Sequence, residues 1–299
     1  MALKKIALAQ FPILRHASLE AALDSLTEWI EGAAQQGAEI LVFPEYGSLD
    51  LLSTITQMET LSLAEQMQAL QPLLKKYDAH LSQLAARLGL VIVAPSVPTQ
   101  NRDDDLVNEA WVYSRRGERH VQSKYHMTRF EAESWGVVTG PSELRLFEVD
   151  GFCFGVQICF DVEFSTASAL LAREGAHAIF APSCTETMAG LHRVHVGARA
   201  RALENQVYVG VSQTVGTATW CEAVDQNRGL AAFYAPPDLG FPENGILAEG
   251  KLDAIQWLVR ELDTQLIDAV REHGAVFNHH NNQIDFQGTS WLAVKKISL

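Results

Sequence analysis

The sequence predicts an α/β fold in which mixed sheets are covered on their outer faces by helices. Apolar strands alternate with helical patterns through nearly the whole chain, which is typical of strand–helix units. Two hairpin-like pairs of strands interrupt this alternation, so antiparallel neighbours are expected beside parallel ones. Sheets of this kind bury their apolar faces against helices. No repeat and no linker is present, so we expect one main domain over residues 1–278.

The N-terminal third carries the clearest alternation. Residues 5–11 predict a strand, and residues 19–30 carry leucine and isoleucine at the spacing of a helix face. Residues 38–45 predict the next strand. The pattern of residues 80–89 predicts a helix that ends at its final glycine, and residues 90–98 predict the strand that follows.

The middle of the chain favours hairpins. Residues 106–114 and 118–124 predict two strands joined by a turn. Residues 143–149 and 152–160 predict a second pair about an Asp-Gly turn, which is a strong hairpin signal.

The C-terminal half returns to strand–helix alternation and ends in an arm. We expect helices over residues 165–175, 191–206 and 263–274, strands over residues 177–183 and 207–216, and strands and loops over residues 228–252. The segment QWLVREL precedes the last of these helices. Residues 279–299 resemble an extended arm rather than a core element. An apolar arm on a closed domain often packs on a partner subunit, so we expect a homodimer or a higher homo-oligomer.

The composition indicates a folded enzyme rather than a nucleic-acid-binding or membrane protein. With 47% hydrophobic residues, a chain of this length can bury a substantial core. The net charge of -13 and the lack of lysine–arginine clusters argue against affinity for nucleic acid or anionic membranes. No apolar run approaches the roughly 20 residues that span a bilayer. Pro12 and Arg15 interrupt the N-terminal apolar run, so we do not expect a signal peptide.

The cysteines predict a reducing compartment. Cys153, Cys159, Cys184 and Cys221 show no CxxC spacing, and a chain of this size does not need disulfides to close its core. We therefore expect free thiols and a cytoplasmic protein. Any one of them would ordinarily be a buried small apolar side chain.

Three reactive side chains each follow a predicted strand. Glu45 follows an apolar strand and a proline, Lys124 ends a hairpin strand, and Cys159 ends a strongly apolar strand just before a helix. The carboxyl ends of strands are where α/β folds gather reactive groups. Taken singly, Glu45 could solvate a loop, Lys124 could lie on the surface and Cys159 could pack in the core. Their common placement favours a shared site.

These segments together resemble the nitrilase superfamily of carbon–nitrogen hydrolases. The resemblance covers nearly the whole chain and places the superfamily's Glu-Lys-Cys triad on Glu45 in FPEYG, Lys124 in SKYHM and Cys159 in GVQICFD. It also places a second glutamate on Glu131. The segment RARALENQVYV, over residues 199–209, is a further signature of the superfamily. The resemblance implies an αββα sandwich of two mixed sheets flanked by helices, and commonly a dimer or a larger oligomer.

Finer features resemble one poorly characterised branch with amidase-like chemistry. The segments TRFE, PSCTE and FPENGILAEG are similar to that branch, some of whose members carry an added acetyltransferase domain for which this chain has no room. Ser165 and Thr166 replace a Pro-Glu pair common in the superfamily, and Ser suits a helix start. Phe160 and Asp161 follow the cysteine as in amidases, whereas nitrilases typically have Trp-Glu there. An amide substrate is therefore favoured over a nitrile.

The residue types suit amide hydrolysis through a thioester. A carboxylate beside a thiol can serve as its base, so we expect Glu45 to take the proton as Cys159 attacks the carbonyl carbon. Lys124 and the backbone N–H of Phe160 would stabilise the oxyanion. Glu131 is assigned, by resemblance, to positioning Lys124 or the substrate amide. Alternatively, it could be a structural partner of Arg129.

Other signals leave alternatives open. His192 and His195 have a helical spacing that can suit a metal, but no further ligand lies nearby, so we expect them on a helix surface. No nucleotide, serine-hydrolase or metal motif is present, and no cofactor is expected. Arg129 could bind a substrate carboxylate, and Cys184 could line the pocket. N-carbamoyl or nitrile hydrolysis, acyl transfer to an amine, and a catalytically silent binding protein remain competing interpretations.

Overall fold

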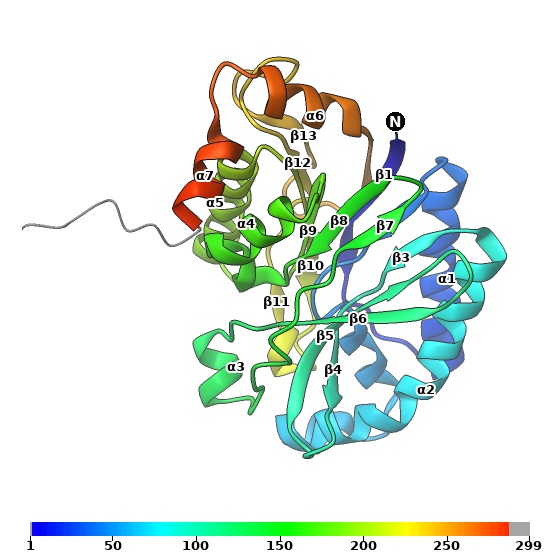
Figure 1. Cartoon of the computed structure of the whole chain (residues 1–299). Coiled ribbons are helices and arrows are strands. Elements are labelled where there is room, and N and C mark those ends of the chain that lie inside the picture. Colours follow the sequence, from blue (N-terminus) through cyan, green and yellow to red (C-terminus); the bar gives the residue numbers. More distant parts are fainter. Residues whose placement is uncertain (1, 287–299) are drawn as a thin grey trace, which may run out of the picture.

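The structure is a computed structural model that describes residues 2–286 (Figure 1). Strand β1 (Leu3–Pro12) is the central strand of its fold. It pairs in parallel with β2 (Ile40–Val42), and antiparallel along most of its length with β14 (Gln256–Asp263). Its last three residues pair in parallel with β10 (Tyr208–Thr217). This short pairing joins two sheets that otherwise lie face to face.

Each sheet mixes parallel and antiparallel neighbours. The first sheet adds β3 (Val91–Val93), β4 (Val97–Gln100), β5 (Leu106–Tyr113) and β6 (Arg119–Ser123). The second adds β7 (Phe147–Val149), β8 (Phe152–Val156), β9 (Ala178–Ser183), β11 (Gln226–Asn227), β12 (Ala232–Tyr234) and β13 (Ile246–Glu249). The hairpin predicted about Asp150-Gly151 joins β7 to β8.

Helices cover the outer faces of both sheets. Figure 1 shows α1 (Leu19–Gln35) and α2 (Leu63–Leu88) on one side of the strands, and α4 (Ser165–Arg173) and α5 (Met188–Asn205) on the other. The remaining helices are α3 (Arg129–Glu133), α6 (Thr264–His273), α7 (Asn278–Phe286) and the 3-10 turns η1 (Gly47–Thr54), η2 (Met58–Thr60), η3 (Cys159–Glu163) and η4 (Glu222–Val224).

Alternating side chains of β1 separate two apolar layers. Ile6 and Leu8 belong to a core that also contains Phe154 and Phe180 of the second sheet, so this layer lies between the sheets. Ala7 and Ala9 belong to a separate cluster formed with α1 and α2. Successive strand residues point to opposite faces, and both faces are buried here. The predicted αββα sandwich is confirmed.

Two elements differ from the sequence prediction. The helix predicted over residues 80–89 begins much earlier, at Leu63, because Ser62 and Glu65 form a reciprocal capping box at its start. The single strand predicted over residues 90–98 is two strands, β3 and β4, separated by a break that contains Ser96. The Ser96 hydroxyl bonds to groups near Glu45 instead of facing solvent.

The predicted C-terminal arm begins within α7. Asn282 donates a hydrogen bond to the side chain of Asn205 on α5 at 2.8 Å, and Gln283 donates to the carbonyl of Ala169 on α4 at 3.2 Å. This helix therefore packs on its own chain. The rest of the predicted arm, residues 287–299, lies outside the described residues, so the predicted subunit contact remains a prediction. Within residues 2–286, no helix combines the length and apolar character that crossing a membrane requires.

Candidate active site

The three predicted reactive side chains converge on one pocket. Glu45 follows β2, Lys124 follows β6, and Cys159 opens η3, three residues beyond β8. All three are buried and line the same cavity of about 690 Å³. Glu131 and Phe160 line it as well. The structure thus brings together the five residues predicted for catalysis and oxyanion binding.

Lys124 is held between two carboxylates. Its Nζ lies 2.7 Å from Oε1 of Glu45 and 2.6 Å from Oε2 of Glu131, and all three side chains are at most 2% exposed. Burial disfavours the ammonium charge, but the two carboxylates outweigh it and raise the pKa of Lys124 above its ordinary value. Lys124 is therefore a fixed positive charge. Two of its three N–H donors are engaged, which leaves one for a substrate.

Glu45 is held by three donors. Lys124 and the side-chain amide of Asn108 donate to Oε1, the latter at 3.0 Å, and the backbone N–H of Cys184 donates to Oε2 at 3.1 Å. Burial raises the pKa of Glu45, Lys124 opposes this shift, and the charge of Glu131 adds to it. The net effect is a carboxyl group that gains a proton more easily than an ordinary glutamate.

Glu131 has the opposite character. It caps α3 reciprocally with Thr128, whose backbone N–H donates to Oε2 at 2.8 Å, and it also accepts the hydroxyl of Tyr46 at 2.7 Å. Burial alone would raise the pKa of Glu131, but Lys124 and these donors lower it. Two neighbouring carboxyls whose pKa values are pushed apart indicate a division of roles. Glu45 is suited to carry a proton, and Glu131 to remain a counter-ion.

Cys159 occupies a strained turn that presents its sulfur to the pocket. Its φ of 50° lies in the left-handed region, which is unusual for a residue with a side chain. The sulfur lies 3.6 Å from the carbonyl oxygen of Cys184. Burial and the charge of Glu45 raise the pKa of Cys159 well above its usual value, against the opposing effect of Lys124. The resting group is a thiol, so attack requires proton transfer to a neighbouring base.

The turn that carries Cys159 is tied to the loop that follows Lys124. Asp161 accepts the backbone N–H of His126 at 2.8 Å with Oδ1 and that of Ile158 at 3.2 Å with Oδ2. Phe160 occupies the first turn of η3, where backbone N–H groups lack acceptors within the helix. An N–H in this position can donate to an oxyanion formed at the sulfur.

Asn108 and Tyr46 contribute to this site and were not anticipated from the sequence. Asn108 is fully buried and lies within 3.5 Å of both Glu45 and Glu131. The available signal was a lone amide inside the apolar strand of residues 106–114. Cys184, left open by the sequence, lines the pocket. Its backbone N–H donates to Glu45, and its carbonyl oxygen lies near the sulfur of Cys159.

Two alternatives left open for Arg129 are wrong, and the helix-surface expectation holds for His192, which is exposed, but not for His195. Arg129 is not a partner of Glu131, because its side chain is 82% exposed and its guanidinium pairs with Glu133 at 2.7 Å. For the same reason Arg129 does not reach the pocket as a carboxylate anchor. His195 is not on the helix surface, since its ring is buried between the hydroxyl of Tyr234 and the side chain of Gln213. Among the described residues, no group of three potential ligands is arranged to hold a metal ion.

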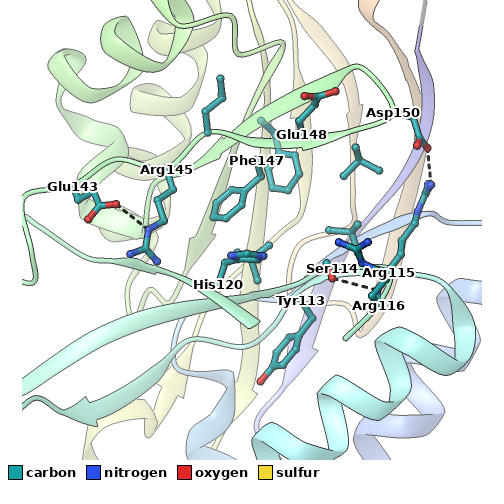
Figure 2. Close-up of a pocket in the computed structure, with 15 residues that line it drawn as sticks. Tyr113, Ser114, Arg115, Arg116, His120, Glu143, Arg145, Phe147, Glu148 and Asp150 are labelled. Atoms are coloured by element: carbon teal, nitrogen blue, oxygen red, sulfur yellow. Dashed lines mark hydrogen bonds and ion pairs between the residues drawn. The ribbon is translucent and has the colours of Figure 1, made fainter. Parts of the chain in front are cut away.

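A larger hollow of about 780 Å³ lies apart from these residues (Figure 2). Four of its charged groups form two ion pairs: Arg115 reaches Asp150 at 2.6 Å, and Arg145 reaches Glu143 at 3.3 Å. None of the residues around Cys159 lines it. Its size alone therefore does not make it the site of chemistry.

Comparison with known proteins identifies the family. The family model for carbon-nitrogen hydrolase matches residues 5–292. "Probable hydrolase YhcX" of Bacillus subtilis is 28% identical over 272 residues, which cover 91% of this chain and 52% of that protein. "Omega-amidase NIT3" of Saccharomyces cerevisiae is 27% identical over 203 residues, which cover 64% of this chain and 65% of that protein. The chain spans well under two thirds of the first of these relatives.

Solved structures share the fold. The crystal structure of Saccharomyces cerevisiae Nit3, a member of branch 10 of the nitrilase superfamily, has a TM-score of 0.71 at 23% identity and covers 90% of this chain and 93% of its own. A carbon-nitrogen hydrolase from Helicobacter pylori has a TM-score of 0.76 at 16% identity, covering 96% and 97%. An amidase from Nesterenkonia sp. has a TM-score of 0.67 at 22% identity, covering 90% and 94%.

Proposed function

Because the chain belongs to the carbon–nitrogen hydrolase family, we propose that it hydrolyses a small linear amide through a thioester on Cys159. The observation that carries this proposal is the contact geometry around Lys124, which sets a base of raised pKa and a fixed cation beside a thiol in one pocket. Relatives that bear the name omega-amidase support an amide substrate, as does the amidase of similar fold that is described with acrylamide added at its active site cysteine.

The first half-reaction forms the thioester. Glu45 accepts the proton of the Cys159 thiol as the sulfur attacks the carbonyl carbon. The third N–H of Lys124 and the backbone N–H of Phe160 stabilise the oxyanion, and loss of one such donor typically costs about 10²–10³ in rate. The protonated Glu45 then gives its proton to the departing ammonia or amine.

The second half-reaction releases the acid. Glu45, again ionised, removes a proton from a water molecule that attacks the thioester carbonyl carbon. Collapse of this second tetrahedral intermediate breaks the carbon–sulfur bond, and the proton on Glu45 returns to the sulfur. One carboxyl group thus serves as base and acid in turn, a role that a raised pKa suits at neutral pH.

Removing the sulfur tests the proposal. The Cys159→Ala variant should fold normally and release no ammonia from a panel of short amides. The wild type mixed with substrate should show an acyl mass on the peptide that contains Cys159. Cys184→Ala is the matched control, because it removes the other thiol lining the same pocket and should leave acylation of Cys159 detectable. Turnover by Cys159→Ala contradicts the proposal.

Analysis of the products distinguishes amide hydrolysis from the competing reactions. N-carbamoyl hydrolysis releases carbon dioxide with ammonia, nitrile hydrolysis consumes a nitrile, and acyl transfer is revealed by hydroxylamine partitioning. A catalytically silent binding protein would show no thiol reactivity at Cys159. The pair of carboxyls with opposed pKa shifts favours the hydrolase, because a binding site has no need of a proton carrier.

Branch, assembly and location are part of the proposal. The segments TRFE, PSCTE and FPENGILAEG support the branch whose members sometimes carry an acetyltransferase domain. We propose a homodimer or a higher homo-oligomer, which the mass in solution by light scattering tests. The four cysteines are free in the structure and support a cytoplasmic location, which cell fractionation tests.

A further inference from the structure

Three carboxylates lie at the solvent-facing entrance of the reactive pocket, which we call its mouth. Glu186 follows β9, Glu222 lies in η4, and Asp225 follows η4. All three line the cavity that contains Cys159, and the two glutamates are exposed. Within residues 2–286, none of the three has an ion-pair partner, unlike the carboxylates deeper in the pocket. Their charge is therefore not neutralised by a cation of the described residues.

The cations of the pocket do not balance this charge. Arg193 on α5 lies at the same mouth and pairs with Glu163 at 3.5 Å. Lys124 at the floor lies between Glu45 and Glu131. Among the described residues that line the cavity, six are carboxylates and two are cations. A cleft lined by one sign of charge concentrates ligands of the opposite sign.

The same pocket also has an exposed aromatic ring. Phe130, on α3, lines the same pocket and is 65% exposed. An exposed ring suits the methylene chain of a flexible ligand, and its face attracts a cation. Anionic ligands gain nothing from this ring or from the carboxylates of the pocket, and Arg129, the neighbouring cation, pairs with Glu133 outside the pocket.

We propose that the substrate is a linear amide whose far end carries a positively charged ammonium or guanidinium group. This inference rests on the proposed amidase function and specifies its substrate class. The Cys159 sulfur attacks the amide carbonyl at the floor, while Glu186, Glu222 and Asp225 bind the cation at the mouth. The same carboxylates repel the free carboxylate of a dicarboxylic acid monoamide. Relatives named omega-amidases therefore do not define the substrate of this chain.

Three amides of matched length and different terminal charge test this inference. They are δ-aminovaleramide, which is cationic, hexanamide, which is neutral, and glutaramate, which is anionic. Ammonia release should give a kcat/KM for the cation that exceeds the neutral value about tenfold, as expected for a few partly exposed ion pairs. Glutaramate should be slower than hexanamide. The preference should shrink as salt is added, because salt screens exposed charges.

Removing the charges of the three carboxylates at the mouth should remove the preference for the cationic amide. The triple variant Glu186→Gln, Glu222→Gln, Asp225→Asn should lower the ratio of kcat/KM for δ-aminovaleramide to that for hexanamide about tenfold. The control variant Asp24→Asn, Glu28→Gln, Glu148→Gln makes the same change in net charge at exposed positions on α1 and β7. It should keep the preference.

The possible outcomes test the inferred substrate class separately from the proposed amidase function. Hydrolysis that depends on Cys159 but favours glutaramate, or ignores terminal charge, overturns the inference and leaves the amidase proposal standing. Absence of turnover and of acylation at Cys159 with all three amides counts against both. A preference for the cation that survives in the triple variant shows that other groups read the charge, and overturns the role given to these carboxylates.

Discussion

The side-chain amide of Asn108 donates a hydrogen bond to Oε1 of Glu45 at 3.0 Å, and a second contact fixes the orientation of that amide. The hydroxyl of Ser96 donates to Oδ1 of Asn108 at 2.7 Å and itself accepts the backbone N–H of Tyr46 at 2.9 Å. Because the Ser96 proton is committed to Asn108, the amide nitrogen must face the carboxylates. Asn108 is thus a positioning residue for the proton carrier.

Replacing Asn108 with leucine should change both the rate and its pH dependence. The leucine side chain is similar in size but removes a donor that favours ionised Glu45, so the pKa of Glu45 should rise further. We expect kcat to fall about tenfold to a hundredfold and the acidic limb of the pH–rate profile to move to higher pH. A merely structural role would reduce the fraction of active enzyme, measured by titration of Cys159, and leave the limb in place.

The wild-type profile follows from the shifts already described. The base Glu45 must be ionised at the start of the reaction, so the rate should fall as the pH falls through its pKa. Since burial raises that pKa, the fall should occur above the range of an ordinary glutamate. Lys124 should cause no loss in the usual alkaline range, because its pKa is also raised. Measurement of kcat/KM from acid to alkaline pH tests both limbs.

Glu131→Gln should move the acidic limb of the pH–rate profile to lower pH, which is opposite to the shift expected for the variant with leucine in place of Asn108. The negative charge of Glu131 raises the pKa of Glu45, so removing it should shift the limb to lower pH. The rate should fall at all pH values, because Lys124 loses one of its two counter-ions. A limb that stays in place or moves to higher pH would contradict the division of roles between the two carboxyls.

The sequence predicts the reactive groups better than their supports. Glu45 and Cys159 each end an apolar run, where a charged or nucleophilic residue is visible as an interruption, and Lys124 ends a predicted hairpin strand. Asn108 lies inside a strand, and its role depends on Ser96, which occupies the break between two other strands. Contacts of this kind connect segments whose separation along the chain gives no pattern.

The same reasoning applies to the fold. Periodicity predicts most strands and helices because each buries one regular face. It does not predict the early start of α2, which depends on local capping by Ser62 and Glu65, or the burial of His195, which depends on Tyr234 from a distant strand. Periodic signals report burial, whereas polar contacts inside a core depend on the final packing.

Gly197 permits α5 to approach the turn that carries Cys159. A methyl group there would lie 2.9 Å from the carbonyl oxygen of Val162 and 3.1 Å from Cα of Glu163, both backbone atoms of η3. Gly197→Ala should therefore displace η3, lower stability by about 1–3 kcal/mol and lower kcat. Gly32→Ala on α1 is the matched control, since nothing lies within 4 Å of its added methyl group. It should keep full activity and a melting temperature at or above the wild-type value.

Asp161→Asn tests whether the link between the Lys124 loop and η3 matters for reactivity. Both carboxylate oxygens of Asp161 accept backbone N–H groups, those of His126 and Ile158. Asparagine can accept only one of them with its oxygen, and its own amide then faces the other donor. Leaving a buried donor unpaired costs about 1–3 kcal/mol, so the melting temperature and the alkylation rate of Cys159 should both fall. His126→Ala keeps the backbone donor and should have neither effect, so equal losses in the two variants would assign the link to the histidine ring instead.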